Sequence, residues 1–303
     1  MKKLPYLASP SRLPDTINLG PVHLIVRDLD KQLEFYQDIL KMKLFSREGD
    51  TAYLGSERDT LLVLSQDSQA KKVAESTGLY HFALLYPSEA DLAQAVYGLF
   101  ELRYPNWPTD HGMSKTTYLK DVEGNEIELY IRTLDRADFV EIGGQQKFLY
   151  KDGRLSDGRD PLDLDELFLS MKERRGLEVL PAGTSIGHLH IYSRDIDEMT
   201  HFYRDILGFG GGGSYRAMRM GEVALSEKRN HVIAYNSWRG SQAPYHDHGC
   251  LGIKNYTIGI KEEDIYKELL ERLDQASVVY EREDRGVRLR DPAGIELIIS
   301  LIS

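Results

Sequence analysis

The chain repeats itself at a distance of 167 residues, and this repeat constrains the fold more than any other feature. Residues 23–40 align with residues 190–207 without a gap, and 9 of the 18 aligned positions are identical. Each copy opens with a short apolar segment that begins at a histidine, His23 or His190, and continues into an amphipathic helix that ends near a Phe-Tyr pair. Two parts of one chain are therefore predicted to share one architecture.

Short strands around single helices fill most of the remaining chain. After a strand at about 20–26 and a helix that begins near Asp28 or Asp30, three more strands are predicted at 43–46, 51–54 and 60–64. Units of the same order begin near residues 79, 185 and 254. The pattern predicts an α+β fold of four βαβββ units. It divides the chain into an arm at 1–17, a first domain at 18–133, a linker with one helix at 134–184 and a second domain at 185–303.

Composition narrows the class of protein. A net charge of -10 over 303 residues argues against a nucleic-acid partner, which would need clustered Lys and Arg. No apolar run approaches the roughly 20 residues of a membrane-spanning helix, so we expect no membrane partner. The single cysteine, Cys250, excludes an internal disulfide and favours the reducing cytoplasm. The sequence is also compatible with a homodimer.

The motifs together resemble the vicinal oxygen chelate superfamily, which includes glyoxalase I, bleomycin-resistance proteins and the extradiol ring-cleaving dioxygenases. The resemblance rests on the four units, the histidines in their opening strands and the Ile-Glu-Leu sequence in two closing strands, at 127–129 and 295–297. The two-domain layout and the segments 110–114 and 236–238 are most similar to bacterial catechol-2,3-dioxygenase-like proteins. The resemblance implies that the units pair into two open, curved, mixed-sheet domains of the glyoxalase type.

The resemblance also implies a metal held by two histidines and one glutamate on strands. It assigns His81 and Glu128 to a site in the amino half, and His188 and Glu296 to a site in the carboxyl half. Each half then lacks one ligand, because Pro21 stands at the remaining position in the first half and an asparagine does so in the second. The candidates for the missing ligands are His23, His111, His190, His246 and His248.

The same resemblance makes His231, which follows a short basic stretch, the candidate acid–base group. An imidazole suits this role because its pKa lies near neutrality. Tyr130, Tyr256 and Asn255 are predicted to line the substrate pocket. Two histidines and one carboxylate suit Fe(II) as the cofactor, with Mn(II) or Zn(II) as alternatives.

Three functions are compatible with these residues. The first is an extradiol dioxygenase that cleaves a catechol-like aromatic diol with O2. The second is a metal-free or vestigial protein that binds a small aromatic molecule, which the incomplete ligand sets favour. The third is a glyoxalase-like lyase or isomerase, which would use the metal without redox change.

Overall fold

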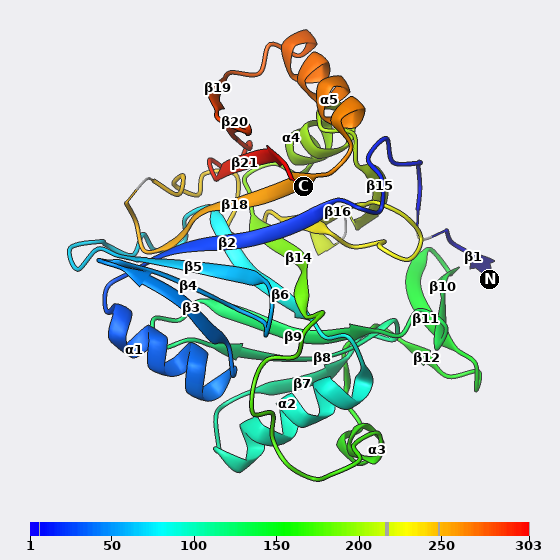
Figure 1. Cartoon of the computed structure of the whole chain (residues 1–303). Coiled ribbons are helices and arrows are strands. Elements are labelled where there is room, and N and C mark those ends of the chain that lie inside the picture. Colours follow the sequence, from blue (N-terminus) through cyan, green and yellow to red (C-terminus); the bar gives the residue numbers. More distant parts are fainter. Residues whose placement is uncertain (6, 216–217, 248, 303) are drawn as a thin grey trace.

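The computed structural model describes residues 1–5, 7–215, 218–247 and 249–302, and it contains the four predicted units (Figure 1). The first unit comprises β2 (Asn18–Val26), α1 (Leu29–Glu34), the π-helical turn η1 (Phe35–Ile39), β3 (Lys43–Glu48), β4 (Thr51–Gly55) and β5 (Thr60–Gln66). The second comprises β6 (Gly78–Leu85), α2 (Glu89–Glu101), β7 (Trp107–Asp110), β8 (Ser114–Lys120) and β9 (Glu126–Arg132).

The carboxyl half repeats this order. The third unit comprises β14 (Ser185–Tyr192), α4 (Ile196–Thr200), η2 (His201–Ile206), β15 (Gly210–Tyr215), β16 (Met220–Ala224) and β17 (Ile233–Asn236). The fourth comprises β18 (Gly252–Ile260), α5 (Glu263–Gln275), β19 (Tyr280–Glu283), β20 (Gly286–Arg290) and β21 (Glu296–Leu301). The predicted βαβββ pattern is therefore confirmed in all four units.

The units pair across the two halves of the chain. The second and third units, together with β13 (Asp160–Pro161) of the linker, form a sheet of nine strands in the order β13-β7-β8-β9-β6-β14-β17-β16-β15. The first and fourth form a sheet of eight strands in the order β19-β20-β21-β18-β2-β5-β4-β3. In each sheet the opening strands of the two units meet in antiparallel fashion, β6 with β14 and β18 with β2. Two mixed sheets are thus present, as predicted.

The expected pairing of neighbouring units is corrected by this topology. Pairing the first unit with the second and the third with the fourth would have put each sheet within one predicted domain, 18–133 or 185–303. The sequence did not distinguish the two arrangements, because the opening strand of every unit offers one free edge with the same hydrogen-bonding groups. The boundaries themselves stay a prediction.

One apolar core lies between the sheets. Val22, Leu84, Ile191 and Ile258, one from the opening strand of each unit, are all buried in the same cluster. The opening strands of the two halves also approach each other closely, since a Cβ at Gly20 would lie 2.8 Å from the side chain of Ile186. The two sheets therefore fold as one body.

The Phe-Tyr pairs of the repeat fix each helix to the following unit. Tyr36 is buried and its hydroxyl donates to Asp121 in the second unit, 3.1 Å away. Its counterpart, Tyr203, donates to Asp291 in the fourth unit at 2.8 Å. Each half is thus linked internally by its helices, while the sheets link one half to the other.

The predicted linker is more ordered than expected. It contains β10 (Ala137–Ile142), β11 (Gln145–Tyr150), β12 (Leu155–Ser156), β13 (Asp160–Pro161) and α3 (Leu164–Leu169), and β1 (Lys2–Lys3) pairs with β10 in a four-stranded sheet. The predicted linker helix corresponds to α3. It packs on α2, where Phe168 lies 5.5 Å from Tyr97 between ring centroids. Across the described residues, no helix has the length and apolar character needed to cross a membrane.

Candidate metal centre

Three side chains on neighbouring strands of the nine-stranded sheet converge on one point. His81 lies on β6, Glu128 on β9 and His188 on β14, which are adjacent in the strand order. The Nε2 atoms of the two histidines lie 3.2 Å apart. Glu128 Oε2 lies 3.0 Å from His188 Nε2 and 3.2 Å from His81 Nε2. Residues assigned to two separate sites in the sequence thus form one cluster.

The spacing of these atoms fits a divalent metal ion. If both imidazoles donate an Nε2–H to Glu128, the two Nε2–H groups face each other and neither can accept a hydrogen bond from the other. Hydrogen bonds therefore do not account for all three contacts among His81, His188 and Glu128. Ligands about 2.1 to 2.2 Å from an ion and at right angles to one another are separated by about 3.0 to 3.1 Å. Two histidines and one carboxylate on one face of an ion are the set that non-haem Fe(II) oxygenases use. The donor set and its spacing therefore both suit a metal.

Burial and mutual contact set the charge of the cluster. Burial raises the pKa of Glu128, but His188 and His81 together bring it well below its usual value. Burial lowers the pKa of His188 to about 3, against the opposing effect of Glu128. An ionised carboxylate and a neutral imidazole are the forms that bind a metal. Glu128 and His188 are thus held in the forms that bind a metal.

Neither histidine of the cluster has an outer hydrogen bond to the described part of the chain. The Nδ1 atoms of His81 and His188 are buried and have no protein partner there. Both rings are instead held by packing against other rings. His188 lies 4.9 Å from Tyr130 and 4.4 Å from His231 between centroids. Aromatic contacts therefore orient the ligand rings.

The eight-stranded sheet has no equivalent cluster at its matching positions. Asn255 on β18 faces His23, as His81 on β6 faces His190, so Asn255 occupies the position of His81. The repeat offset of 167 puts Pro21 at the position of His188. Neither side chain is a metal ligand of the usual kind.

The third ligand position of that sheet is apolar. Asn255 pairs with Glu296 in the strand register, whereas the equivalent partner of His81 is Glu126. Ile298 therefore stands where Glu128 does, and the assignment of Glu296 as a ligand beside His188 is corrected. The carboxylate of Glu296 instead contacts Arg288 and accepts from Asn255.

The sequence held a signal for this register. Glu296 follows Asp291 by five residues, as Glu126 follows Asp121, whereas Glu128 follows Asp121 by seven. Counting from the turn would have aligned Glu296 with Glu126.

The other candidate ligands lie outside the cluster. His23 contacts the Ser65 hydroxyl at 2.7 Å, and His246 lies 2.6 Å from the carbonyl oxygen of Ile253. His190 lies beside the cluster, 5.1 Å from the His81 ring, but its Nε2 accepts from Asn236 at 2.9 Å. His248 lies outside the described residues.

His111 links Tyr118, which lies beside the cluster, to Gly158 of the linker. Its Nδ1 donates to the carbonyl of Gly158, and its Nε2 accepts from the hydroxyl of Tyr118 at 2.8 Å. Burial and the nearby Glu128 raise the pKa of Tyr118 well above its usual value, so this hydroxyl keeps its proton. His111 therefore orients a neighbour of the cluster and does not belong to it.

His231, the candidate acid–base group, lies against the cluster. Its ring contacts that of His188, and its Nδ1 donates to Glu222 Oε2 at 2.5 Å. Burial alone lowers the pKa of His231, but the attraction of Glu222 and its hydrogen bond raise it above the usual value. Glu222 was not identified from the sequence, because nothing there showed that β16 lies beside His231.

A cavity of about 620 Å³ opens onto the cluster and is of the right size for a small aromatic molecule. Its lining includes His81, Glu128, His188, His190, His111, His231 and Tyr130. Two predicted pocket residues lie elsewhere. Tyr256 is fully buried and bonded to Tyr203, and Asn255 belongs to the other sheet.

The sequence of this chain is similar to those of known proteins. A model of the Glyoxalase/Bleomycin resistance protein/Dioxygenase superfamily matches residues 18–129. Metallothiol transferase FosB of Staphylococcus epidermidis is 30% identical over 128 residues, which are 41% of this chain and 89% of that protein. The chain belongs to the glyoxalase/bleomycin resistance protein/dioxygenase superfamily.

A second relative matches almost the whole chain. Catechol-2,3-dioxygenase of Bacillus subtilis (strain 168) is 29% identical over 278 residues, which are 91% of this chain and 94% of that protein. A Bacillus subtilis protein of known structure shares 12% identity with a TM-score of 0.62, covering 97% of this chain and 86% of its own. That likeness concerns the fold, which is the two-sheet fold of this superfamily.

In this superfamily member the linker covers the cavity. Phe139 on β10 and Phe148 on β11 line it opposite the sheet, and a Cβ at Gly112 would lie 3.0 Å from the Phe148 ring. These aromatic residues were missed because the charges and glycines of the linker indicated a loose segment.

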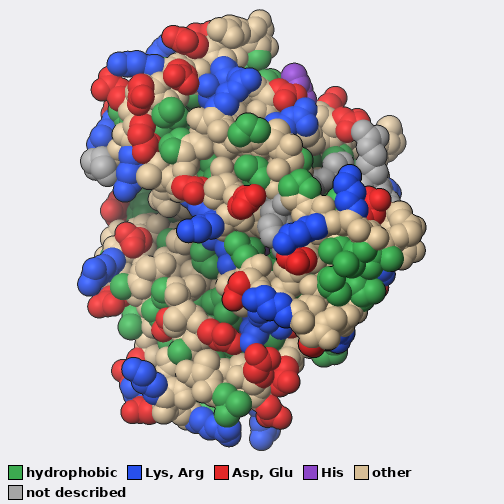
Figure 2. Space-filling model, turned by 90° about the vertical axis from the view of Figure 1, so that its right-hand side faces the viewer, with side chains coloured by type: hydrophobic (Ala, Val, Ile, Leu, Met, Phe, Trp, Pro, Cys, Tyr) green, Lys and Arg blue, Asp and Glu red, His purple; other side chains and the backbone are tan. Residues whose placement is uncertain are grey.

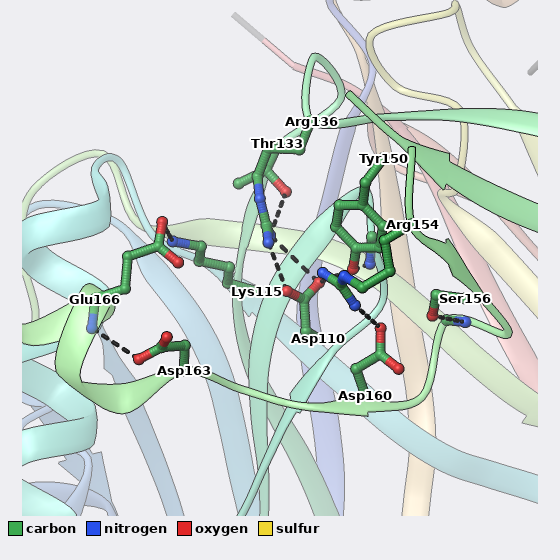
Figure 3. A network of polar contacts seen from close by, with 12 residues as sticks. Asp110, Lys115, Thr133, Arg136, Tyr150, Arg154, Ser156, Asp160, Asp163 and Glu166 are labelled. Carbon is green, nitrogen blue, oxygen red and sulfur yellow. Dashed lines mark hydrogen bonds and ion pairs between the residues drawn. The ribbon is translucent and has the colours of Figure 1, made fainter. Parts of the chain in front are cut away.

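An ion-pair network fastens the linker to the second unit (Figure 3). Asp110 at the end of β7 accepts from Arg136 at 2.5 Å and from the Tyr150 hydroxyl at 3.0 Å. Lys115 on β8 is buried and its Nζ lies 3.1 Å from Glu166 of α3. The cover of the cavity is therefore anchored at both ends.

Proposed function

We propose that the chain is a metal-dependent extradiol dioxygenase that opens the ring of a catechol-like aromatic diol with O2. The observation that carries the proposal is the convergence of His81, Glu128 and His188 at 3.0 to 3.2 Å beside a cavity of about 620 Å³. The relative that spans 91% of the chain favours this chemistry over the other reactions of the superfamily. Fe(II) is the metal we propose first, and Mn(II) is the second choice.

In the proposed enzyme the three residues hold the ion from one side. His81, His188 and Glu128 occupy three ligand positions and leave the side toward the cavity for the substrate. The bound metal would supply redox and Lewis-acid chemistry for the reaction between diol and O2. The remaining side chains bind and orient the ring and control protons.

His231 is the proposed proton carrier. Its Nδ1–H is committed to Glu222, which fixes the ring and leaves Nε2 as the atom that accepts or donates a proton. Because its ring lies 4.4 Å from that of His188, a diol oxygen at the cluster lies within its neighbourhood.

Aromatic walls would hold the flat ring. Tyr130 and Trp238 line the cavity on the sheet side, and Phe148 covers it. Such walls bind an aromatic ring by burial and offset stacking, and they exclude water from the reacting atoms.

The test uses metal reconstitution and a matched pair of variants. The protein is purified anaerobically, loaded with Fe(II) and assayed with a panel of catechols by the absorbance of the ring-opened product. His188→Ala is expected to lose the metal and at least about a thousandfold of activity, because an open ligand position weakens the site. His23→Ala removes a histidine of the other sheet and is expected to keep the metal.

Three results would point elsewhere. Bound metal without cleavage of any catechol would favour a glyoxalase-like lyase, isomerase or thiol transferase, which need no redox change. Protein that binds an aromatic diol but no metal would favour a metal-free binding protein. Metal that is lost from His23→Ala but kept by His188→Ala would refute the site itself.

A further inference from the structure

Two arginines line the cavity without an acidic partner. Arg132 at the end of β9 donates to the Tyr130 hydroxyl at 3.2 Å and to the carbonyl of Gly187 at 3.4 Å. Arg159, in the exposed segment after β12, makes no hydrogen bond or ion pair with the described residues. A guanidinium carries five N–H donors, so most of the donors on these two side chains are available to a ligand.

The acidic residues of the cavity are already engaged. Glu128 contacts both histidines of the cluster, and Glu222 accepts from His231. Asp157 at the rim pairs with Lys147. Among the described residues of the lining, the carboxylates therefore have partners while the two arginines do not pair with a carboxylate.

Both cations line the cavity in which the diol is proposed to bind. Arg132 contacts the residue that precedes His188, so it lies beside the cluster. Arg159 follows Gly158, whose carbonyl accepts from His111, so it lies on the covering segment. A ring that meets the cluster through its two oxygens would direct its remaining positions toward the rest of the cavity.

This positive charge is local. The whole chain has a net charge of -10. On the face beside the covering strands, acidic and basic side chains are interspersed rather than grouped by sign (Figure 2). The two arginines in the cavity are therefore a feature of the site and do not continue a positively charged patch on this face.

We propose that the substrate is a catechol whose ring carries a carboxylate side group, and that Arg132 and Arg159 recognise this group. The inference rests on the proposed function and adds the class of diol. Arginine suits the role because its planar fork matches a carboxylate through two parallel hydrogen bonds. A neutral side group of the same shape would leave the arginines without a counter-charge.

The test compares each acid with its own amide. Catechols that carry a carboxylate directly, through one methylene or through two are paired with the corresponding primary carboxamides. Binding is measured anaerobically by titration calorimetry, and turnover is measured separately with O2. At least one acid is expected to bind about tenfold or more tightly than its amide, the usual range for a charge-assisted pair.

The variants localise the recognition. Arg159→Gln and Arg132→Gln are each expected to reduce the acid-over-amide ratio about threefold or more. Arg290→Gln removes an exposed arginine of the eight-stranded sheet and is the control for overall charge, so it should leave the ratio as it is.

The outcomes separate this inference from the proposed function. Cleavage of acids and amides with equal efficiency and equal affinity would overturn the inference and leave the dioxygenase standing. A ratio that neither Arg159→Gln nor Arg132→Gln changes would also overturn it. An acid preference in binding that depends on these arginines, without ring cleavage, would support the anion site and refute the dioxygenase.

Discussion

His23 shows how a repeated residue can keep its place in the sheet while its surroundings change. It occupies the position of His190 in the other sheet, where no ligand set surrounds it. Burial, with a smaller effect from Lys254 and Arg288, lowers its pKa from 6.5 to about 4. The imidazole is therefore neutral in the folded protein and contacts Ser65.

The pKa of His23 predicts a pH effect on stability. The unfolded chain binds a proton near pH 6.5 but the folded chain does so only near pH 4, so the unfolding free energy falls as the pH falls between these values. In His23→Gln this part of the slope should be missing, whereas the other buried histidines contribute equally to both proteins. Urea unfolding at several pH values measures the difference, and parallel curves for the two proteins would contradict it.

Gly187 illustrates a constraint of another kind. A Cβ at this position would overlap the hydroxyl and ring of Tyr130, which packs on His188. Gly187→Ala is therefore expected to cost about 1–3 kcal/mol of stability and to weaken metal binding, because Tyr130 must move. Gly240→Ala is the comparison variant. Its new Cβ meets open space, so any cost there comes from the positive φ of Gly240 and not from overlap with a neighbour. Unchanged metal affinity in Gly187→Ala would show that Tyr130 does not hold the ligand ring.

Among the strands and helices, the hairpin β10–β11 is the main feature that the sequence did not predict. The strands and helices of the four units followed from apolar periodicity, because each has one buried face. The hairpin β10–β11 lacks such a face against the main core, and its two phenylalanines, Phe139 and Phe148, face the cavity. Local patterning therefore could not reveal it.

The Asp110 network predicts that the hairpin can be loosened without touching the cluster. Asp110→Asn removes the ion pair with Arg136, which is largely buried, and should cost about 2 kcal/mol. We expect KM for the diol to rise several-fold with little change in kcat, because the cover binds the ring but does not react. Steady-state kinetics and thermal unfolding measure the two effects.

A matched variant on the same hairpin tests this reading. Asp138 pairs with Lys3 at an exposed site, so Asp138→Asn should cost less than about 0.5 kcal/mol and leave KM unchanged. Equal effects of the two variants, or a fall in kcat alone in Asp110→Asn, would contradict the role given to the cover.

In the whole molecule the two halves share one cluster. Each half taken alone therefore contains an incomplete set of candidate ligands. Both halves contribute side chains to one cluster, because β6 and β14 pair across the repeat. His81, Glu128 and His188 were all named as candidate ligands from the sequence, but their meeting in one cluster depended on a contact between strands more than 100 residues apart. A repeat in the sequence shows that units are alike and does not show which of them meet.

This arrangement predicts the behaviour of a divided chain. Fragments 1–174 and 175–303, broken in the exposed loop after α3, separate His81 and Glu128 from His188. Neither fragment alone should bind one metal ion per chain, whereas the co-expressed pair should form an equimolar complex that does. Metal analysis with size-exclusion chromatography tests it, and full metal binding by one fragment would contradict the shared site.

The eight-stranded sheet has the architecture of the nine-stranded sheet without its cluster. It reproduces the strand order of the nine-stranded sheet but carries Pro21, Asn255 and Ile298 where the other has its three converging side chains. The eight-stranded sheet is therefore an internal control for the nine-stranded sheet. A paired substitution at equivalent places in the two sheets measures, within a single polypeptide, what chemistry demands of a residue over and above what folding demands.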